Sequence, residues 1–598
     1  AYSLKNIEHF YLEERTGEVR DAGASVVYYN RWKETGDKDC LTHIKEYNKN
    51  DLISTYRLRE WLLKIRPENL PWADYEEAKD SKSNDITKRN DKELRLFEYQ
   101  KKLTANLPED RTRWKKRDEV KELTYYLLDF QRRAAKPVWW SVFSRAEMTP
   151  EELMENVEAI GNMYHDPANP PYKDKNSYVY TYLYPEQETK IKTGDSCVIT
   201  DTLQSINKLV VDEDALKVTF SYPAKKGMLN TRLSIGLGGP LNSDSLTDAV
   251  YRFADSIIEQ NKKYPALEAI LSRDIPRIKG YKRGSSIIDE NQGSMHDIID
   301  AVANLDNSYL FIQGPPGAGK TYTGSHIIVE LLRRGNRVGV SSNSHKAINN
   351  LLSDVERVAS QKGFSFRGVK KSTSDDSVFN GRYIQDAFSN EGALSMDYQL
   401  IAGTAWLFSD PQAYKMLDYL FVDEAGQVAL ANLIAMGTSA RNIVLLGDQM
   451  QLSQPIQGIH PGRSGESCLE YLLNGMATIP PERGIFLNRT WRLHPDICDF
   501  ISEAVYDGRL KPEPSTANFY LVLGKDAHPV LKPSGVVYVP VEHDACSQRS
   551  AEEAQVVKEI YESLMEQHYF EKKEKKKRIT EENILVVAPY NMQVNLLK

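Results

Sequence analysis

The fold is decided by residues 308–334, which read SYLFIQGPPGAGKTYTGSHIIVELLRR. The apolar run Tyr309–Ile312 has the length of a short buried strand, and apolar residues at helical spacing follow the glycines. Between these two elements, Gly314–Thr321 matches the pattern G-x-x-x-x-G-K-S/T of a phosphate-binding loop. Its glycines let backbone N–H groups turn toward phosphate, and the following helix N-terminus adds partial positive charge. The stretch therefore predicts a nucleoside triphosphate site, and the flanking strand and helix argue against a chance glycine-rich turn.

Two side chains of this loop have specific expected roles. Lys320 reaches the β- and γ-phosphates, and the hydroxyl of Thr321 holds Mg²⁺. The expected cofactors are therefore ATP and Mg²⁺. The other residues predicted to contact the nucleotide lie along the loop and the first helical turn: Gly314, Pro315, Pro316, Gly317, Ala318, Gly319 and Tyr322.

Composition places the chain among globular proteins of several domains. Of its 598 residues, 41% are hydrophobic and 27% are charged, as in soluble proteins. No apolar run approaches the roughly 20 residues that a membrane span needs, and no signal-peptide pattern is present. The five cysteines are scattered without a C-x-x-C pair, which argues against a disulfide framework or a metal cluster and suits a reducing cytoplasm. The net charge of −7 means that any nucleic-acid site must be a local groove.

Residues 39–63 predict an amphipathic helix that carries a candidate metal ligand. Tyr47 and Asp51 lie four residues apart and so share one helix face. This Y-x-x-x-D resembles the third motif of the RNase H-like 3′–5′ exonucleases, in which the Asp holds a catalytic metal. An ordinary helix with an exposed Asp is the alternative that this short motif alone favours. No convincing D-x-E partner exists among Glu8, Glu13, Glu14 and Glu18, and one carboxylate cannot hold two metals, so no nuclease activity is expected from this stretch itself.

Beyond the phosphate loop, short apolar strands end in polar residues. Strands are predicted at Gln399–Gly403, Tyr419–Val422 and Asn442–Leu446, with helical segments between them. Such alternation describes a doubly wound α/β sheet with its site along the carboxyl edge of the strands. The acids that follow the second of these strands have the Walker B arrangement: Asp423 would hold Mg²⁺ through water, and Glu424 would polarise the attacking water. The buried strand before them argues against a simple surface pair.

Four segments, GPPGAGKT, DEAGQ, GDQMQL and TWRLHP, occur in the order and spacing of the superfamily 1 helicases. The chain resembles the nonsense-mediated-decay-type branch, and in particular the RecB-like nuclease–helicase fusion proteins. The resemblance and the composition together imply the C-terminal part of an RNase H-like exonuclease domain at 1–66, a helical linker at 67–166, a small β-barrel at 167–240, a stalk helix at 241–283, and two RecA-like motor domains at 284–475 and 476–598, the second incomplete.

The same resemblance implies roles for single residues. Gln451 would sense the γ-phosphate, Arg492 would supply a transition-state arginine from the second motor domain, and Trp491 would stack on adenine. Gln292 is the nearest match to the adenine-reading glutamine, although it sits several residues too early. The residues that match the strand-binding motifs are Ser342, Asn343, Ser344, His345, Thr404 and Trp406.

The second motor domain is expected to begin near Gly484. Strands are predicted at Val536–Val541 and Ile584–Ala588, with a helix at Ala551–Phe570 between them. The last two helicase motifs do not occur before Lys598, so the sequence is interpreted as an internal piece of a longer protein.

The function implied by the resemblance is that of an ATP-dependent helicase that moves 5′→3′ on single-stranded nucleic acid. The expected partner is single-stranded or forked DNA, with RNA as the other candidate, no membrane, and an undetermined oligomeric state. The alternative function is that of a P-loop ATPase switch or protein-remodelling factor without unwinding activity. A scaffold that retains an inactive motor is a further alternative.

Overall fold

The structure is a computed structural model that describes residues 8–12, 28–29, 31–32, 36–67, 79–290, 292–452, 455–544, 546, 548–571 and 576–598. The chain forms two compact units, Ala1–Leu94 and Arg95–Lys598. Glu13, Glu14 and Glu18, considered above as metal ligands, lie outside the described residues. Within the described part, no helix combines the length and the apolar character needed to cross a membrane.

The first unit is largely helical. Its main element is α3 (Lys38–Ile65), which confirms the predicted helix and begins at Asp37, whose carboxylate caps the first turn. Tyr47 is buried on this helix and Asp51 is half-buried one turn later. Among the described residues, no three His, Cys, Asp or Glu side chains lie together as a metal site. The metal-binding role of Asp51 therefore stays a prediction.

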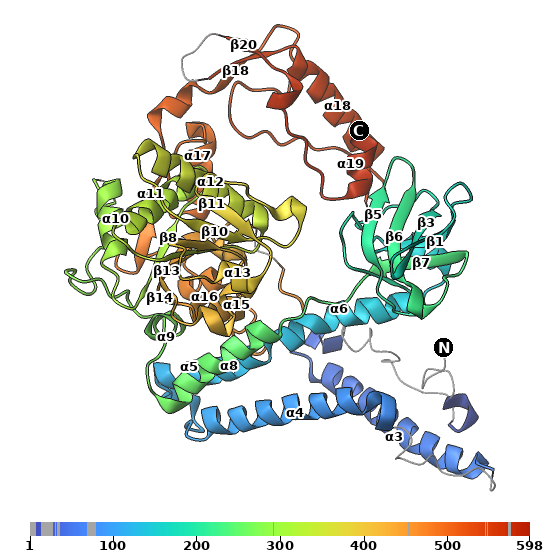
Figure 1. Ribbon diagram of the computed structural model, residues 1–598. Helices are drawn as coiled ribbons and strands as arrows, with labels where there is room; N and C mark the ends of the chain where they lie inside the picture. Colours follow the sequence, from blue (N-terminus) through green and yellow to red (C-terminus); the bar gives the residue numbers. More distant parts are fainter. Residues whose placement is uncertain are drawn as a thin grey trace. The chain divides into compact units, whose positions relative to one another are not determined.

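The second unit begins with a layer of helices that leads into an antiparallel sheet (Figure 1). α4 (Lys79–Thr104) spans the boundary between the units. The helices that follow are α5 (Lys116–Leu128), α6 (Phe130–Glu147), α7 (Pro150–Met154) and, after the sheet, α8 (Asp244–Glu259). The antiparallel strands are β1 (Ala159–His165), β2 (Tyr172–Asp174), β3 (Ser177–Leu183), β4 (Cys197–Ile199), β5 (Asn207–Asp212), β6 (Lys217–Pro223) and β7 (Arg232–Leu237).

This antiparallel sheet has the strand order β4-β7-β1-β3-β6-β5, with β2 paired to β3. The chain just before β4 meets β5 at the other edge, because the N–H of Gly194 donates to the carbonyl of Leu209 at 2.9 Å. The sheet thus curls around an aromatic core that includes Tyr180, Tyr182 and Phe220. These are the short strands expected for the small barrel, although β1 begins before residue 167.

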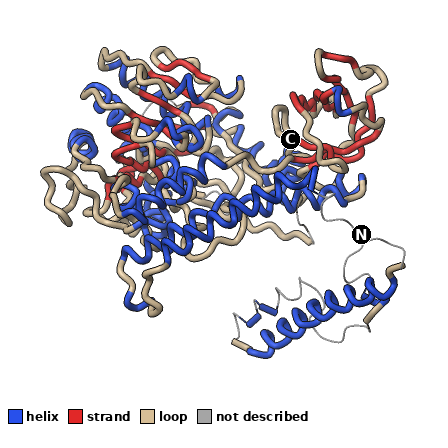
Figure 2. Tube along the Cα trace, turned by 60° about the horizontal axis from the view of Figure 1, so that its bottom comes forward, coloured by secondary structure: helices blue, strands red, loops and turns tan. Residues whose placement is uncertain are grey.

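A second sheet of eight parallel strands carries the phosphate loop, and Figure 2 shows its strands as a group apart from those of the barrel. Its order is β11-β10-β12-β9-β13-β14-β8-β15. The strands are β8 (Tyr309–Gln313), β9 (Val338–Ser341), β10 (Gly368–Lys371), β11 (Ile384–Ala387), β12 (Leu400–Ala402), β13 (Leu417–Val422), β14 (Ala440–Gly447) and β15 (Gly484–Phe486).

Helices cover both faces of this sheet, so its central strands are largely apolar, whereas β10 and β11 at one edge also carry Lys370, Lys371 and Asp386. One face packs against α10 (Met295–Ala303), α11 (Lys320–Arg333) and α12 (His345–Gln361). The other face packs against α8, α9 (Pro265–Leu271), α14 (Ala405–Phe408), α15 (Leu430–Gly437) and α16 (Cys468–Leu473). The short α13 (Asn390–Ala393) contacts β10. The doubly wound α/β fold is therefore confirmed.

The strand β15 lies in a sheet other than the expected one. The sequence placed the start of the second motor domain near Gly484, but residues 484–486 pair with β8 and extend the first sheet. A glycine suits this position, because a Cβ on Gly484 would lie 2.5 Å from the carbonyl oxygen of Phe311. The chain therefore leaves the first sheet beside the strand that leads into the phosphate loop.

After β15 the strands are short. The pair β16 (Arg489–Thr490) and β17 (Lys511–Pro512) flanks α17 (Pro495–Val505), and β18 (Tyr520–Val522), β19 (His568–Phe570) and β20 (Lys577–Arg578) form a separate sheet. The remaining helices are α18 (Ala551–Met565) and α19 (Asn591–Leu597).

Two predicted strands of this region are wrong. Val536–Val541 and Ile584–Ala588 are not strands, and Tyr538 and Leu585 in them are 86% and 87% exposed. An apolar run forms a strand only where another strand accepts its backbone hydrogen bonds, and no described strand lies beside either run. The predicted helix Ala551–Phe570 ends at Met565, and its last residues form β19.

Candidate nucleotide site and strand-contact residues

The phosphate loop joins β8 to α11 in a conformation that depends on glycine. Gly317 and Gly319 have φ angles of +74° and +83°, in the left-handed region that favours glycine. A Cβ on Gly314 would collide with the side chain of Lys320. The ammonium group of Lys320 donates a hydrogen bond to the carbonyl of Gly314 at 2.8 Å. The loop is thus a close backbone turn with a cation folded over it, as a phosphate site requires.

The segment after β15 is bound directly to this loop. The hydroxyl of Thr490 donates to the carbonyl of Pro316 at 2.9 Å, and the backbone N–H of Trp491 donates to the carbonyl of Gly317 at 3.0 Å. A Cβ on Gly317 would lie 2.5 Å from the Cβ of Arg492. The Arg492 side chain is exposed beside the loop, and the Trp491 side chain is 61% exposed. The structure therefore brings three residues of TWRLHP to the phosphate loop.

Asp423 and Glu424 follow β13 at the same edge of the sheet. Asp423 is 5% exposed and accepts a hydrogen bond from the N–H of Glu424 at 3.0 Å. Burial, and then the charge of Glu424, raise the pKa of Asp423 to about 6, while the nearby Lys320 acts in the opposite direction. A buried carboxylate beside a second acid is costly unless a cation neutralises it. This donor set therefore fits a divalent cation next to Lys320.

Asp448, which follows β14, joins Gln451 to a residue that sequence reasoning missed. The buried carboxylate of Asp448 accepts hydrogen bonds from the amide of Gln451 at 3.2 Å and from the hydroxyl of Tyr506 at 2.6 Å. Tyr506 follows α17 and is 2% exposed. Its pKa is raised by burial and by its bond to Asp448. The predicted γ-phosphate sensor is thus held by an aspartate that also binds the chain beyond β15.

Gln313, the residue before the loop, is a second residue that sequence reasoning missed. Its side chain is fully buried; its amide nitrogen donates to the carbonyl of Ala477 at 3.0 Å, and its amide oxygen accepts from the N–H of Ile479 at 2.7 Å. The same amide nitrogen reaches Gln449 at 3.1 Å. A polar residue at the end of an apolar strand was the available signal. These bonds tie the phosphate loop to the segment that leads into β15.

The polar turn after β9 holds most of the predicted strand contacts. Ser344 caps α12 through the N–H of Ala347 at 3.1 Å, and the amide of Asn343 donates to the carbonyl of Gln427 at 2.5 Å. The hydroxyl of Ser342 is buried without a hydrogen-bond partner among the described residues. His345 contributes a second such atom, Nδ1, and burial, followed by Lys370 and Lys371, lowers its pKa. The turn therefore has polar atoms to offer a ligand and is linked to the Walker B segment.

The second predicted strand turn lies at the end of β12. Thr404 is the N-cap residue of α14, and the indole N–H of Trp406 donates to the carbonyl of Asn242 at 2.7 Å. This bond fixes α14 to the chain that precedes α8. Gln292, the candidate adenine reader, is exposed, and its backbone N–H donates to the carboxylate of Asp289 at 3.2 Å. Its role at the adenine stays a prediction.

Comparison with known families agrees with this geometry. Residues 292–462 and residues 465–598 each match an AAA domain, and residues 1–63 match the RNase H superfamily. Together with the order of the motifs, these matches support the assignment of the chain to the superfamily 1 helicases. The chain carries an RNase H-like N-terminal segment, as the sequence motifs predicted.

Curated relatives match this chain at low identity. The DNA replication ATP-dependent helicase/nuclease JHS1 of Arabidopsis thaliana is 24% identical over 354 residues, which cover 55% of this chain and 25% of that protein. The DNA replication ATP-dependent helicase/nuclease dna2 of Schizosaccharomyces pombe is 26% identical over 34% of this chain and 14% of its own length. The chain thus spans a quarter or less of these two relatives.

Two further proteins match different shares of this chain and of their own length. The DNA polymerase alpha-associated DNA helicase A of Schizosaccharomyces pombe is 24% identical over 34% of this chain and 37% of its own length. Among solved structures, an arterivirus nonstructural protein 10 (helicase) in complex with DNA is 13% identical and covers 57% of this chain and 59% of that one. Its TM-score of 0.30 is too low to support a comparison of the folds.

Proposed function

We propose that this chain is the motor of an ATP-dependent helicase that translocates 5′→3′ on single-stranded DNA within a nuclease–helicase fusion protein. The observation that carries the proposal is the pair of hydrogen bonds from Thr490 and Trp491 to the phosphate loop. These bonds place Arg492, from a part of the chain beyond the first sheet, beside the loop that holds Lys320. A transition-state arginine on a movable segment is the arrangement by which such motors link chemistry to motion.

The residues present fit ATP and Mg²⁺. Lys320 and the loop N–H groups would bind the β- and γ-phosphates, and Thr321 and Asp423 would hold the metal. Mg²⁺, when bound with the triphosphate, supplies positive charge at the β- and γ-phosphate oxygens. Glu424 orients the attacking water and accepts its proton. Arg492 neutralises the charge that develops on the phosphoryl group, and Gln451 reports the state of that group through Asp448.

Strand contacts are proposed for the two polar turns at the carboxyl edge. Ser342, Asn343, Ser344 and His345 would hydrogen-bond to the backbone of the strand, which needs no sequence readout. The bond from Asn343 to Gln427 connects this turn to the segment after Glu424. Thr404 would contribute a further hydroxyl, and Trp406 would position that turn through its bond to Asn242.

The names of the relatives support DNA as the strand and a nuclease as the fused activity. In the longer protein, we expect a metal-dependent 3′–5′ exonuclease that Asp51→Ala weakens. Equal digestion by wild type and variant would remove Asp51 from the site. The cytoplasmic location inferred from the cysteines stays a prediction.

Phosphate release, measured with and without single-stranded DNA, tests the motor. We expect the strand to stimulate turnover, and we expect Lys320→Ala and Glu424→Gln to abolish unwinding of a forked duplex by the longer protein. If single-stranded DNA leaves ATP turnover unchanged, the switch or remodelling alternative is favoured. If the longer protein still unwinds the duplex with either substitution, this chain does not drive unwinding and is an inactive scaffold. Single-stranded RNA and duplexes with one 5′ or one 3′ tail separate the strand type and the polarity.

A further inference from the structure

A basic hollow lies at the end of β8 opposite the phosphate loop. It has a volume of about 300 Å³ and is formed by the connection of residues 275–287, between α9 and α10, together with Asp306 and Glu482. Asp306 precedes β8 and Glu482 precedes β15, so the hollow lies at the amino ends of these strands. The phosphate loop follows the carboxyl end of β8. The hollow is therefore separate from the nucleotide site.

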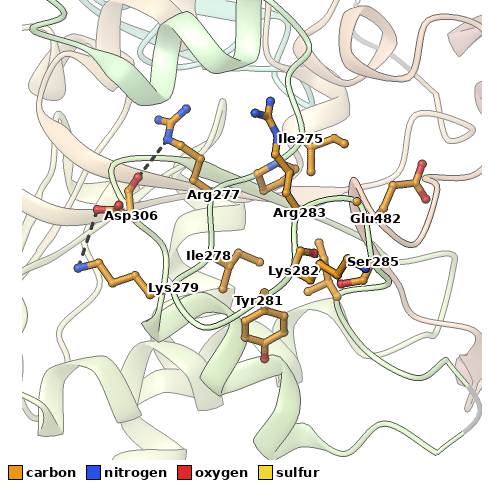
Figure 3. A pocket seen from close by; sticks show the side chains of 13 residues that line it. Ile275, Arg277, Ile278, Lys279, Tyr281, Lys282, Arg283, Ser285, Asp306 and Glu482 are labelled. Carbon is orange, nitrogen blue, oxygen red and sulfur yellow. Dashed lines mark hydrogen bonds and ion pairs between the residues drawn. The ribbon is translucent and has the colours of Figure 1, made fainter.

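Four cationic side chains line this hollow against two acids. The cations are Arg277, Lys279, Lys282 and Arg283. Figure 3 shows the guanidinium groups of Arg277 and Arg283 on one side of the hollow, with Asp306 and Glu482 at opposite ends. In a chain whose net charge is −7, this excess of positive charge within one short connection is a local attraction for anions.

Arg277 is held in place by carbonyl groups rather than by a carboxylate. Its Nε donates to the carbonyl of Asp306 at 3.4 Å, and its Nη2 donates to the carbonyls of Pro265 and Asn307. These three bonds fix the plane of the guanidinium without neutralising its charge. Its Nη1 makes no hydrogen bond to a described residue. Arg277 is therefore a preorganised donor with a free amino group.

The other cations are also largely uncommitted. Lys279 lies 3.8 Å from Asp306, at 69% side-chain exposure, where an ion pair contributes little. Neither Lys282 nor Arg283 pairs with any acid among the described residues, although Glu482 lines the same hollow. Gly280 and Gly284 flank this pair with φ angles of +81° and +84°, so two tight turns present it to solvent. The lining also includes the apolar side chains of Ile278 and Ile287.

We propose that this hollow binds phosphate groups of a single-stranded nucleic acid, as a second strand contact outside the two polar turns. A lining that combines cationic side chains with Ile278 and Ile287 suits a nucleotide unit, whose phosphate is charged and whose base has apolar faces. Cations spread over seven residues suit successive phosphates of one strand better than a single free anion. The proposal relies on the nucleic-acid partner proposed above but not on ATP turnover.

The test is strand binding without ATP by the chain in which Lys282 and Arg283 are both replaced by Gln. The probe is a labelled oligothymidylate, titrated at several salt concentrations. We expect binding to weaken by about tenfold at low salt, and the slope of log affinity against log salt to fall by about 0.7 for each lost phosphate contact. Lys225→Gln with Lys226→Gln, an exposed lysine pair on the antiparallel sheet, removes the same charge elsewhere and is the matched control.

Two competitors identify the source of the anion. Thymidine 5′-monophosphate should not displace the oligonucleotide from wild type when it is added at the concentration at which the oligonucleotide saturates the protein. Polyglutamate should bind wild type and the Lys282/Arg283 variant equally. The proposal would be overturned if the variant lost binding of the mononucleotide or of polyglutamate but still bound the oligonucleotide as wild type does. A variant with unchanged affinity and unchanged salt slope would overturn it as well.

Failure of this proposal is distinguishable from failure of the motor. A strand that stimulates ATP turnover, together with unchanged binding by the variant, rejects the hollow and leaves the motor. A strand that does not stimulate turnover, but whose binding the variant loses, rejects the motor and leaves the hollow. No strand binding by wild type rejects both.

Discussion

The two parts of the motor differ in how they are held together. The first part has eight parallel strands buried between two layers of helices, and it carries Lys320, Asp423 and Glu424 on short turns at one edge. The part after β15 has strands of two or three residues. It joins the first part through a small apolar contact that buries Cys498, Tyr506 and Leu510, through the ion pair of Arg509 with Glu290, and through single hydrogen bonds. The main ones run from Thr490 to Pro316, from Trp491 to Gly317 and from Tyr506 to Asp448.

This difference shows which contact can open at a small cost in free energy. Displacing an element of the packed sheet would expose the large apolar core. Opening the contact between the two parts would expose only a few side chains, chiefly Cys498, Tyr506 and Leu510, and break a few hydrogen bonds, each of net value about 1 kcal/mol. Bonds of this kind are the ones that a bound phosphate can shift. The rigid part would therefore bind the nucleotide, and the lightly held part would respond to it.

The largest expected effect is that of Lys320→Ala in the rigid part. Loss of the ammonium removes the charge that faces the phosphates, and ATP turnover should fall by at least about 100-fold. Lys362→Ala, at the exposed end of α12, is the control and should leave turnover unchanged. Phosphate release measures both. Comparable activity in the two variants would mean that the loop is not a catalytic phosphate site.

Gly317→Ala breaks the contact between the two parts. The new Cβ meets Arg492 at 2.5 Å and the Thr490 hydroxyl at 2.7 Å, in a backbone with φ +74°. We expect ATP turnover to fall by about 10- to 100-fold, because Arg492 is displaced.

Gly335→Ala separates this collision from backbone strain. Gly335 has φ +81° with no atom within 4 Å of a new Cβ, so only strain remains, about 1 kcal/mol of unfolding free energy. Turnover and urea unfolding of both variants give the comparison. Equal turnover in both would show that the approach of Arg492 is irrelevant to catalysis.

Asp423→Asn probes the charge buried in the rigid part. The carboxyl ionises near its ordinary pKa of 3.8 in the unfolded chain and near 6 when folded. As pH rises through this window the unfolded chain releases its proton first, so the free energy of unfolding falls and stays low above pH 6. The Asn variant should therefore gain up to about 3 kcal/mol at pH 8 and little at pH 4, while it loses ATP turnover. Urea unfolding at both pH values measures this, and an equal gain at both would reject a charge effect.

Tyr506→Phe should have the smallest effect and tests the lightly held part. It removes the donor to Asp448, and we expect about fivefold less stimulation of ATP turnover by a strand, with little change in turnover without one. Tyr309→Phe is a matched control, because its buried hydroxyl donates to the carbonyl of Asp274 at 2.6 Å within the first part. Both should lose about 1 kcal/mol of stability. Equal stimulation in the two variants would limit Tyr506 to packing.

The sequence predicted most of the rigid part and much less of the other. Tyr309–Arg333, the Walker B pair and the polar turns were predictable because each is a local pattern of strand, turn and helix. The pairing of β15 with β8 was not, since three apolar residues do not specify which strand accepts their hydrogen bonds. The same reason explains the failure at Val536–Val541 and Ile584–Ala588.

Residues that act across long separations were also missed. Tyr506 and Asp448 are 58 residues apart, and Gln313 and Ala477 are 164 apart. A tyrosine after a helix has no distinctive local pattern. A glutamine at the end of an apolar strand is a signal, but it does not identify the partner, and only the fold brings each residue to its partner. The role of Gln292 stays a prediction, since its match to the adenine-reading motif lacks the correct spacing.

The position of β15 limits how far Arg492 can travel. Phe486 is fixed in the sheet beside β8, and Arg492 lies six positions after it, so the arginine remains on a tether no longer than about 20 Å even with every contact to the loop broken. The opened motor would therefore keep its arginine within a short diffusive search of the phosphates. Reclosing would depend on the length of this linker rather than on the encounter of two independent bodies.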